Sequence, residues 1–258
     1  LQRLTEANVA VLLSDARHLP AGLLLPLAGH TLHQKHLQSQ IKTPPDDVER
    51  LWRLTVAAKI ANQSRVLAHL GKPNEALERL AQKTANAQTL ASPAEARAAK
   101  LYWKELTEPA FQRNPDGTDA LNLFLNYGYA IIRAIVARGL VGAGLLPAWG
   151  LWHRNQYNAF ALADDVMEPY RPAVDLAALR LWEKHPAAAE LTRNLKAELL
   201  KIPQTPVGFK GKIYQLGETV PYACAALARC YLGERQTLDY PALCPSIPNL
   251  SYPTDLCG

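Results

Sequence analysis

The pattern of apolar and polar residues divides the chain into a short first part and a longer helical part. Up to about residue 40, apolar residues occur in short runs, at 9–13 and 23–27, and the turn-forming residues 14–15 and 20–22 interrupt them. Short apolar runs between such residues are typical of strands, although periodicity alone does not separate a short strand from a helix. We therefore predict that residues 1–40 are the C-terminal part of a small β-containing domain.

Beyond residue 43 the periodicity becomes helical. Leu51, Leu54, Thr55 and Ala58 share one stripe with a period of about 3.6 residues, and Gly71 is suited to end that helix. Asp119 is a predicted N-cap. Further helices are predicted over 73–88, 92–106, 120–141, 158–168, 173–184, 186–201 and 219–231, with a basic connector at 201–212. The predicted fold is mostly α (α+β overall): the β remnant, a larger helical domain over 41–232, and a Pro-rich irregular tail over 233–258.

Composition narrows the class of protein without deciding it. Apolar residues make up 48% of the chain, which is ample for a core. The longest apolar stretch, residues 121–146, contains Asn126, Arg133 and Arg138. Charges in lipid are costly, so this stretch is predicted to be a core helix and not a membrane span.

Cysteines and net charge carry weaker information. The four cysteines show no C-x-x-C spacing and no neighbouring His, which argues against a zinc site or a disulfide scaffold and favours a reduced, cytoplasmic protein. The formal charge of +5, from 28 Lys and Arg against 23 Asp and Glu, is compatible with a polyanionic partner but too modest to establish one. The chain begins at Leu1, and we expect some N-terminal sequence to be absent.

The most polar interruption of the helical region is the segment 153–171. Asp165 and Glu168 are three residues apart and would share one face of a helix, as would Asp164 and Glu168 at a spacing of four. Carboxylates suit Mg²⁺, and an imidazole such as that of His153 shifts the preference toward Mn²⁺. Alternatively, the aspartates are solvated, Glu168 pairs with Arg171, and His153 has no ligand role. A D-D-x-x-E motif alone is a weak signal.

Glu95 has a structural interpretation of its own. With Ser92 three residues earlier, it matches a capping box, in which the glutamate returns to the backbone N–H of the serine. The periodicity gives no reason to connect Glu95 with His153.

Several motifs in order resemble the CRISPR spacer-acquisition integrase family. Residues 95–103 match the pattern E-x-x-A-A-x-x-Y-[WF], and they are followed by NYGYAIIR at 126–133, GLLPAWG at 144–150, His153, FALADDVMEPYRP at 160–172, and Asp175. Near the start, DARHLP at 15–20 and LPL at 25–27 resemble the end of that family's β domain. The resemblance covers about residues 9–185 and looks closest to the branch associated with single-protein RNA-guided effectors. It implies that the first half of the β domain is absent.

The resemblance implies a metal-dependent DNA integrase and endonuclease whose helical domain is catalytic. Glu95, His153 and Glu168 would hold Mn²⁺ or Mg²⁺. Asp165 would either support these ligands from behind or bind an auxiliary metal, and Asp164 would lie outside the site. A protospacer 3′-OH would attack a phosphodiester in a CRISPR repeat, and water in its place would give hydrolysis. This activity belongs to adaptive antiviral defence.

The resemblance also implies partners. These are double-stranded and branched DNA, a second copy of the chain, and a small ferredoxin-like adaptation protein. Basic residues are candidates for phosphate contact, although each is equally compatible with a solvated surface charge. They are Arg97, Lys100, Arg133, Arg138, Arg154, Lys201, Lys210 and Lys212.

Two other interpretations stay open. An isoprenoid-synthase-like enzyme would grip a magnesium diphosphate with Asp164, Asp165 and Glu168, but no second aspartate-rich motif is visible in a later helix. A non-catalytic helical DNA-binding subunit would bind DNA after metal chelation and would carry out no strand transfer.

Overall fold

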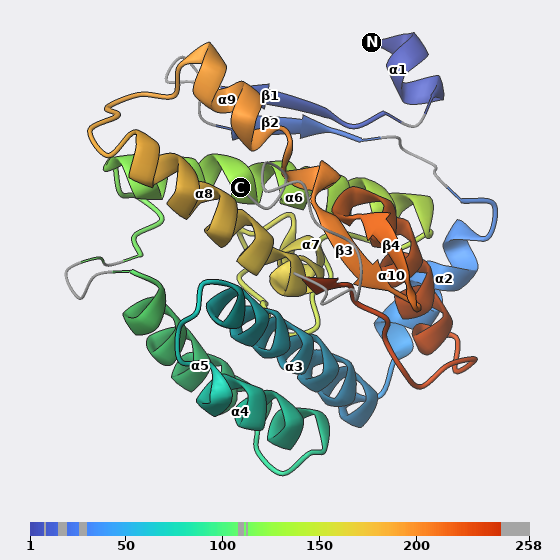
Figure 1. The fold of residues 1–258 in the computed structure, drawn as a ribbon. Coiled ribbons are helices and arrows are strands. Elements are labelled where there is room, and N and C mark those ends of the chain that lie inside the picture. The colour runs from blue at the N-terminus through green and yellow to red at the C-terminus, as the bar shows by residue number, and fades with distance from the viewer. Residues whose placement is uncertain (8, 15–19, 26–29, 108–110, 112, 244–258) are drawn as a thin grey trace.

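The computed structural model describes residues 1–258 except 8, 15–19, 26–29, 108–110, 112 and 244–258 (Figure 1). The elements, in chain order, are α1 Gln2–Glu6, β1 Val11–Ser14, β2 Pro20–Leu24, α2 His33–Lys42, α3 Pro45–His69, α4 Glu75–Ala85, α5 Ala91–Leu106, α6 Ala120–Gly142, α7 Ala161–Val166, the 3₁₀ helix η1 Glu168–Tyr170, α8 Arg171–Lys184, α9 Arg193–Leu199, the 3₁₀ helix η2 Ile202–Gln204, β3 Pro206–Phe209, β4 Lys212–Gln215, α10 Leu216–Tyr231 and β5 Ala242–Leu243. The mostly α class with a small β part is confirmed. The division into domains at residues 40 and 232 stays a prediction.

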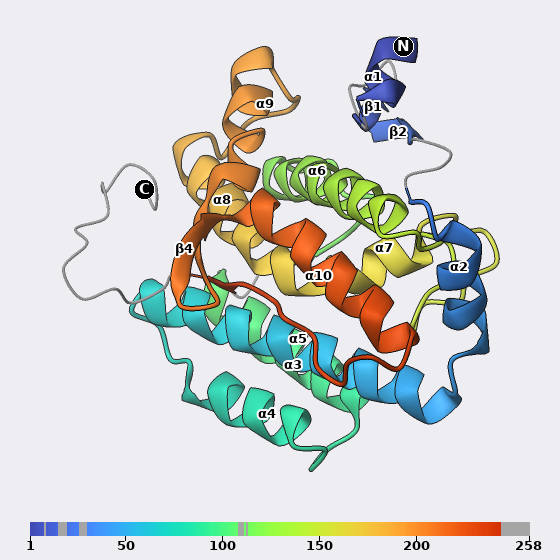
Figure 2. The same cartoon turned by 90° about the vertical axis from the view of Figure 1, so that its right-hand side faces the viewer.

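The core forms around α3 and α6. Helix α3 packs against α4 and α5 on one side and against η1 and α8 on the other, while α6 packs against α8 and α10 (Figures 1 and 2). Trp52, Ile60, Tyr102, Phe124 and Ile132 are fully buried where these helices meet. Burying one large apolar side chain stabilises a fold by roughly 1.5–3 kcal/mol, so these contacts contribute strongly to the stability of the helical framework.

Helix α6 agrees with the prediction of a core helix. Its N-cap is Asp119, whose side chain accepts a hydrogen bond from the backbone N–H of Asn122, as the sequence predicted. Of the described helices, α6 alone is long and apolar enough to cross a membrane by length and composition, and 72% of that apolar window is buried inside the protein.

The first 42 residues contain two strands that overlap the predicted runs 9–13 and 23–27 only in part, and two helices that were not predicted. Strand β2 begins at Pro20, so the turn predicted at 20–22 is wrong, and residues 26 and 27 lie outside the described residues. Strands β1 and β2 form an antiparallel hairpin with Val11 opposite Leu24, and the hairpin lies against α6. Helix α2 was not predicted because it has no apolar stripe: the two residues that it buries, His36 and Gln40, are polar. The His36 ring bonds to the carbonyl of Ala143, so a hydrogen bond takes the place of an apolar stripe.

The C-terminal third departs from the prediction in three places. The helix predicted over 186–201 is confined to α9, and the predicted connector at 201–212 contains η2 and β3 and reaches the first residue of β4. Strands β3 and β4 form a tight antiparallel hairpin whose turn residues, Lys210 and Gly211, both have positive φ. Strand β5 pairs with β3, so part of the predicted irregular tail is ordered, and the remainder, 244–258, lies outside the described residues.

Candidate metal centre

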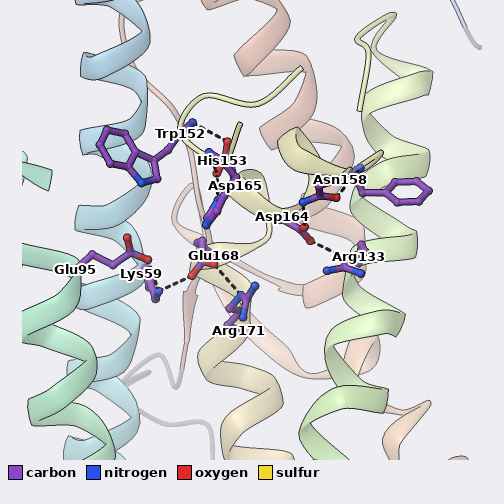
Figure 3. A network of polar contacts seen from close by, with 11 residues as sticks. Lys59, Glu95, Arg133, Trp152, His153, Asn158, Asp164, Asp165, Glu168 and Arg171 are labelled. Carbon is purple, nitrogen blue, oxygen red and sulfur yellow. Dashed lines mark hydrogen bonds and ion pairs between the residues drawn. The ribbon is translucent and has the colours of Figure 1, made fainter. Parts of the chain in front are cut away.

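Two glutamates that are distant in the sequence meet at one point in the interior. Glu95 lies on α5 and Glu168 begins η1, and α3 places Lys59 between them (Figure 3). The Lys59 Nζ is 2.7 Å from Glu95 Oε1 and 2.5 Å from Glu168 Oε2. Two carboxylates therefore already converge on a single cation.

The capping-box interpretation of Glu95 is wrong. Helix α5 begins at Ala91 with Leu90 as its N-cap, and no side chain caps it. Ser92 is therefore inside the helix, and its backbone N–H is not the one that a capping box would satisfy. The Glu95 side chain turns instead toward Lys59 on the neighbouring helix.

Glu168 is a buried carboxylate held by two cations. Its side chain is 4% exposed; Oε1 lies 2.9 Å from Arg171 Nε, and Oε2 faces Lys59. Burial raises the pKa of Glu168, but Arg171 and Lys59 outweigh that effect and hold the pKa below its ordinary value. The pairing with Arg171 that the sequence suggested is present, yet it occupies only one oxygen. Glu168 Oε2 has no hydrogen bond of normal geometry within the described chain, because its contact with Lys59 is an ion pair without that alignment.

His153 is positioned by Asp165. The Asp165 carboxylate is fully buried and accepts hydrogen bonds from the backbone N–H of Trp152 at 2.9 Å and of His153 at 3.3 Å. It also lies 2.5 Å from the His153 Nδ1. This bond raises the pKa of His153, and the charges of Glu168 and Glu95 add to the effect. Because Nδ1 is engaged, Nε2 is the nitrogen left for a ligand or a metal.

The loop that carries His153 is also anchored from α2. The Gln40 side-chain amide donates to the carbonyls of Leu146 and Trp149, and its oxygen accepts from the backbone N–H of Leu146. A cavity of about 600 Å³ opens beside this loop, with Gln40, His153 and Tyr157 among its lining residues. The structure thus leaves room for a ligand next to His153.

Asp164 has a different role from Asp165. Its two oxygens accept hydrogen bonds from Arg133 Nε at 2.6 Å and from the Asn158 side chain at 2.8 Å (Figure 3). These contacts tie the loop before α7 to α6. Asp164 therefore lies outside the glutamate pair, as the family resemblance implied.

The predicted DNA-contacting residues fall into two groups. Some are engaged within the protein: Arg133 with Asp164, Lys201 with Glu198 at 2.7 Å, and Lys210 with Asp239 at 3.3 Å. The others are exposed and form no ion pair with another described residue; they are Arg97, Lys100, Arg138, Arg154 and Lys212. Arg97 and Lys100 share α5 with Glu95, and Arg154 follows His153 directly.

The predicted metal ligands fit a divalent cation in their chemistry. As they stand, no three His, Cys, Asp or Glu side chains of the described residues are gathered closely enough to hold a metal. The Lys59 ammonium lies where Glu95 and Glu168 meet, and Asp165 engages the Nδ1 of His153. Two carboxylates and one imidazole nevertheless suit Mn²⁺ or Mg²⁺, and the poorly satisfied Glu168 Oε2 already faces a positive charge. The ligand set stays a prediction.

Sequence reasoning missed Lys59. One signal was present, because Lys59 stands in the otherwise apolar run 56–61, and a lysine in such a run needs a partner if it is buried. The identity of that partner depends on how α3 packs against α5 and η1, which the periodicity of α3 does not contain.

These features define a class: a mostly helical protein in which a buried and a partly exposed glutamate meet near a histidine, with a small β hairpin against one helix. The family described as CRISPR associated protein Cas1 matches residues 1–200. This chain belongs to the CRISPR associated protein Cas1 family, which confirms the resemblance inferred from the motifs.

One curated relative agrees with that assignment, and two solved structures share the fold. The CRISPR-associated endonuclease Cas1 of Neisseria meningitidis serogroup C is 39% identical over 203 residues, which are 78% of this chain and 66% of that protein. A casposase bound to integration product has a TM-score of 0.69 at 18% identity and covers 95% of this chain and 82% of its own. A Cas6-RT-Cas1–Cas2 complex has a TM-score of 0.70 at 20% identity, over 91% of this chain and 30% of that one. The chain spans just under two thirds of the length of the relative from Neisseria meningitidis and of one from Pyrobaculum aerophilum, and less of some others.

Proposed function

We propose that this protein is a metal-dependent DNA integrase and endonuclease that joins protospacer 3′-OH ends to a CRISPR repeat by transesterification. The observation that carries the proposal is the convergence of Glu95 and Glu168 on one cation, with His153 oriented beside them by Asp165. The relative from Neisseria meningitidis is named an endonuclease, and the casposase of similar fold is bound to an integration product. Both names support the same reaction class.

The chemistry divides between a cation and the protein. Mn²⁺ or Mg²⁺ held by Glu95, His153 and Glu168 would polarise a phosphoryl oxygen and orient the attacking hydroxyl. Arg171 keeps Glu168 ionised, and Asp165 holds the His153 ring through Nδ1 so that Nε2 is presented. The incoming 3′-OH forms one phosphodiester bond while the repeat strand loses another, with release of a new 3′-OH. Water as the nucleophile gives hydrolysis instead.

DNA would be held by exposed basic residues of the segments that carry the predicted ligands. Arg97 and Lys100 continue the helix that carries Glu95, and Arg154 continues the loop of His153. These cations suit the phosphate backbone. Tyr157 is 87% exposed and Trp152 is 46% exposed on the same loop, and such rings offer stacking surfaces to unpaired bases. Both features favour a splayed or branched DNA substrate over a small molecule.

The protein would act as a homodimer with a small ferredoxin-like partner in the cytoplasm. Two coupled attacks need two active sites at a fixed separation, and paired identical chains supply that most simply. The β1–β2 hairpin leaves Leu13 56% exposed, and an apolar strand edge favours association. The solved complex that contains Cas1 and Cas2 is a precedent for such an assembly.

The isoprenoid-synthase-like alternative finds no support in the site. Asp164 is engaged by Arg133 and Asn158, whereas Asp165 is buried against the backbone of Trp152 and His153. Helix α7 ends at Val166 before Glu168 is reached, so the three carboxylates do not line one helical face. A diphosphate would have no common cation site among them.

The test is strand transfer with matched DNA ends. Protospacer duplexes with 3′-OH or 3′-dideoxy ends are incubated with a repeat duplex in Mn²⁺, Mg²⁺ or EDTA. We expect joined product only with 3′-OH ends and a divalent ion, and a loss of about 100-fold or more in His153→Ala. His185→Ala, which alters an exposed histidine at the end of α8, should retain full activity. DNA binding that survives EDTA, with no joining under any condition, would instead establish a non-catalytic DNA-binding subunit.

A further inference from the structure

Lys59 is a buried cation that the proposed chemistry does not use. Its side chain is 13% exposed and extends from α3 between Glu95 and Glu168 (Figure 3). Burying an ammonium group is costly unless opposite charges surround it, and here two carboxylates do. Burial lowers the pKa of Lys59, but Glu168 and Glu95 more than compensate, so the group stays charged.

The two glutamates depend on that charge to different extents. Glu168 has a second cation, Arg171, on its other oxygen, whereas Glu95 forms no other ion pair within the described chain. Without a cation between them, two carboxylates that converge on one point would repel each other strongly in a site of low dielectric constant. Some positive charge must therefore stand between Glu95 and Glu168 in every state of the protein in which both are ionised.

A divalent ion at the proposed centre would need the same oxygens. The ammonium contacts of 2.5 and 2.7 Å leave no space for a metal between Nζ and the carboxylates, because oxygens bind Mg²⁺ at about 2.1 Å. Lys59 and the metal are therefore alternatives. Lysine suits this exchange because its four-carbon stem is flexible and its charge is compact.

We propose that Lys59 is the built-in counter-ion of this centre, which holds Glu95 and Glu168 together without metal and which a divalent ion must displace. The inference rests on the proposed metal site and adds a competitor to it. The exchange replaces one positive charge by two, so the net charge of the two carboxylates with their cation rises from −1 to zero. The affinity for metal is lowered by the fraction of molecules in which Lys59 occupies the site.

The test compares metal binding without any DNA. Lys59→Met replaces lysine by an unbranched apolar side chain that is one atom shorter, and it removes the charge. We expect Mn²⁺ affinity to be about tenfold tighter, measured from the electron paramagnetic resonance signal of free Mn²⁺, because the competitor is gone. In EDTA the same variant should melt below the wild-type protein, and Mn²⁺ should raise its melting temperature by a larger increment.

Two variants serve as controls. Lys59→Arg retains the charge and should bind Mn²⁺ no more tightly than the wild-type protein does. Lys104→Met removes a charge that is 73% exposed near the end of α5, and it measures the general effect of losing one cation, for which we expect a change of less than about threefold. If Lys59→Met does not fold with or without Mn²⁺, Lys59→Gln is held to the same tenfold criterion.

The outcomes separate the inference from the proposed function. Mn²⁺ binding by Lys59→Met that is equal to wild type or weaker overturns the counter-ion role alone. Absence of Mn²⁺ binding in every variant overturns the counter-ion role together with the metal site. Tighter binding by Lys59→Met in a protein that joins no DNA would uphold the counter-ion role and refute the proposed function.

Discussion

Glu95→Gln distinguishes a structural role from a catalytic role for one side chain. The substitution keeps the size of the side chain and one oxygen that can accept a hydrogen bond from Lys59 Nζ, but it removes the charge. Lys59 would keep its contact with Glu168, 2.5 Å away. The Glu95 side chain is 21% exposed, and partly exposed ion pairs contribute about 1 kcal/mol or less. For a chain of 258 residues this corresponds to a fall in melting temperature of about 2–4 °C.

The expected effect on activity is far larger than that on stability. If Glu95 is a metal ligand, its charge contributes directly to holding the cation, and we expect strand transfer in Mn²⁺ to slow by about 100-fold or more, which is close to 3 kcal/mol. Initial rates of joining and thermal melting by circular dichroism, both in the same buffer, measure the two quantities. Glu105→Gln is the matched control, since it alters a partly exposed glutamate near the end of the same helix, whose Lys104 partner is 3.7 Å away.

A specific result would refute this reasoning. If Glu95→Gln joined DNA at more than about a third of the wild-type rate in Mn²⁺, the loss would be under 1 kcal/mol and Glu95 would not be a metal ligand. A melting temperature more than about 10 °C below that of the wild type would instead show that the ion pair with Lys59 stabilises the fold far more than a surface ion pair does.

Four further measurements follow from the same geometry. His153→Ala and Glu168→Ala should act as a unit, so that the double variant is at most about threefold slower than either single one, whereas multiplied losses would indicate separate roles. The Asp165 hydrogen bond raises the pKa of His153, and a protonated ring cannot bind metal. Mn²⁺ affinity should therefore increase with pH above about 6.5. Asp165→Asn should move the midpoint of this pH dependence to lower pH, and a shift to higher pH would contradict the role of Asp165. The same variant should slow strand transfer less than the loss of a metal ligand does. Burial raises the pKa of Asp175 to about 6, so its contribution to stability is fully present below pH 3.8 and is lost as the pH rises through 6. The unfolding free energy of Asp175→Asn, measured in urea, should therefore rise relative to that of the wild type by up to about 3 kcal/mol between pH 4 and pH 7. A difference between the two proteins that does not change with pH would argue against a raised pKa of Asp175. Finally, Lys212→Ala should flatten the log–log dependence of DNA affinity on salt by about 0.9 if that exposed side chain contacts one phosphate, and an unchanged slope would remove it from the interface.

The sequence alone determined most of the helical framework. Helices α3, α5, α6 and α10 lie close to their predicted ranges, since an apolar stripe and a capping residue such as Asp119 are local signals. The family was also readable from the sequence, because its motifs follow one another in order along the chain, and the match over residues 1–200 confirms it.

Elements stabilised by long-range polar contacts were not predictable in the same way. Helix α2 buries His36 and Gln40, whose partners are carbonyls in the segment 143–149, far along the chain. Strands β3 and β4 are each four residues long, and turn-forming residues surround them. In both places the local pattern is that of a polar connector. The hydrogen bonds that order α2 come from elsewhere in the fold, whereas β3 and β4 pair with each other in strands too short to show a strand pattern.

The candidate centre shows the same limit more sharply. Read only from neighbouring residues, Glu95 was a capping residue, and Asp164 and Asp165 were equivalent members of one weak motif. In the packed structure Glu95 contacts Lys59, whereas Asp164 pairs with Arg133 and Asp165 with His153. Short-range signals report which backbone conformation a segment adopts, whereas a site of this kind consists of side chains from four separate segments. Only the packing of α3, α5, η1 and the His153 loop decides which charges meet, because each charge is stabilised by groups that are distant in the sequence.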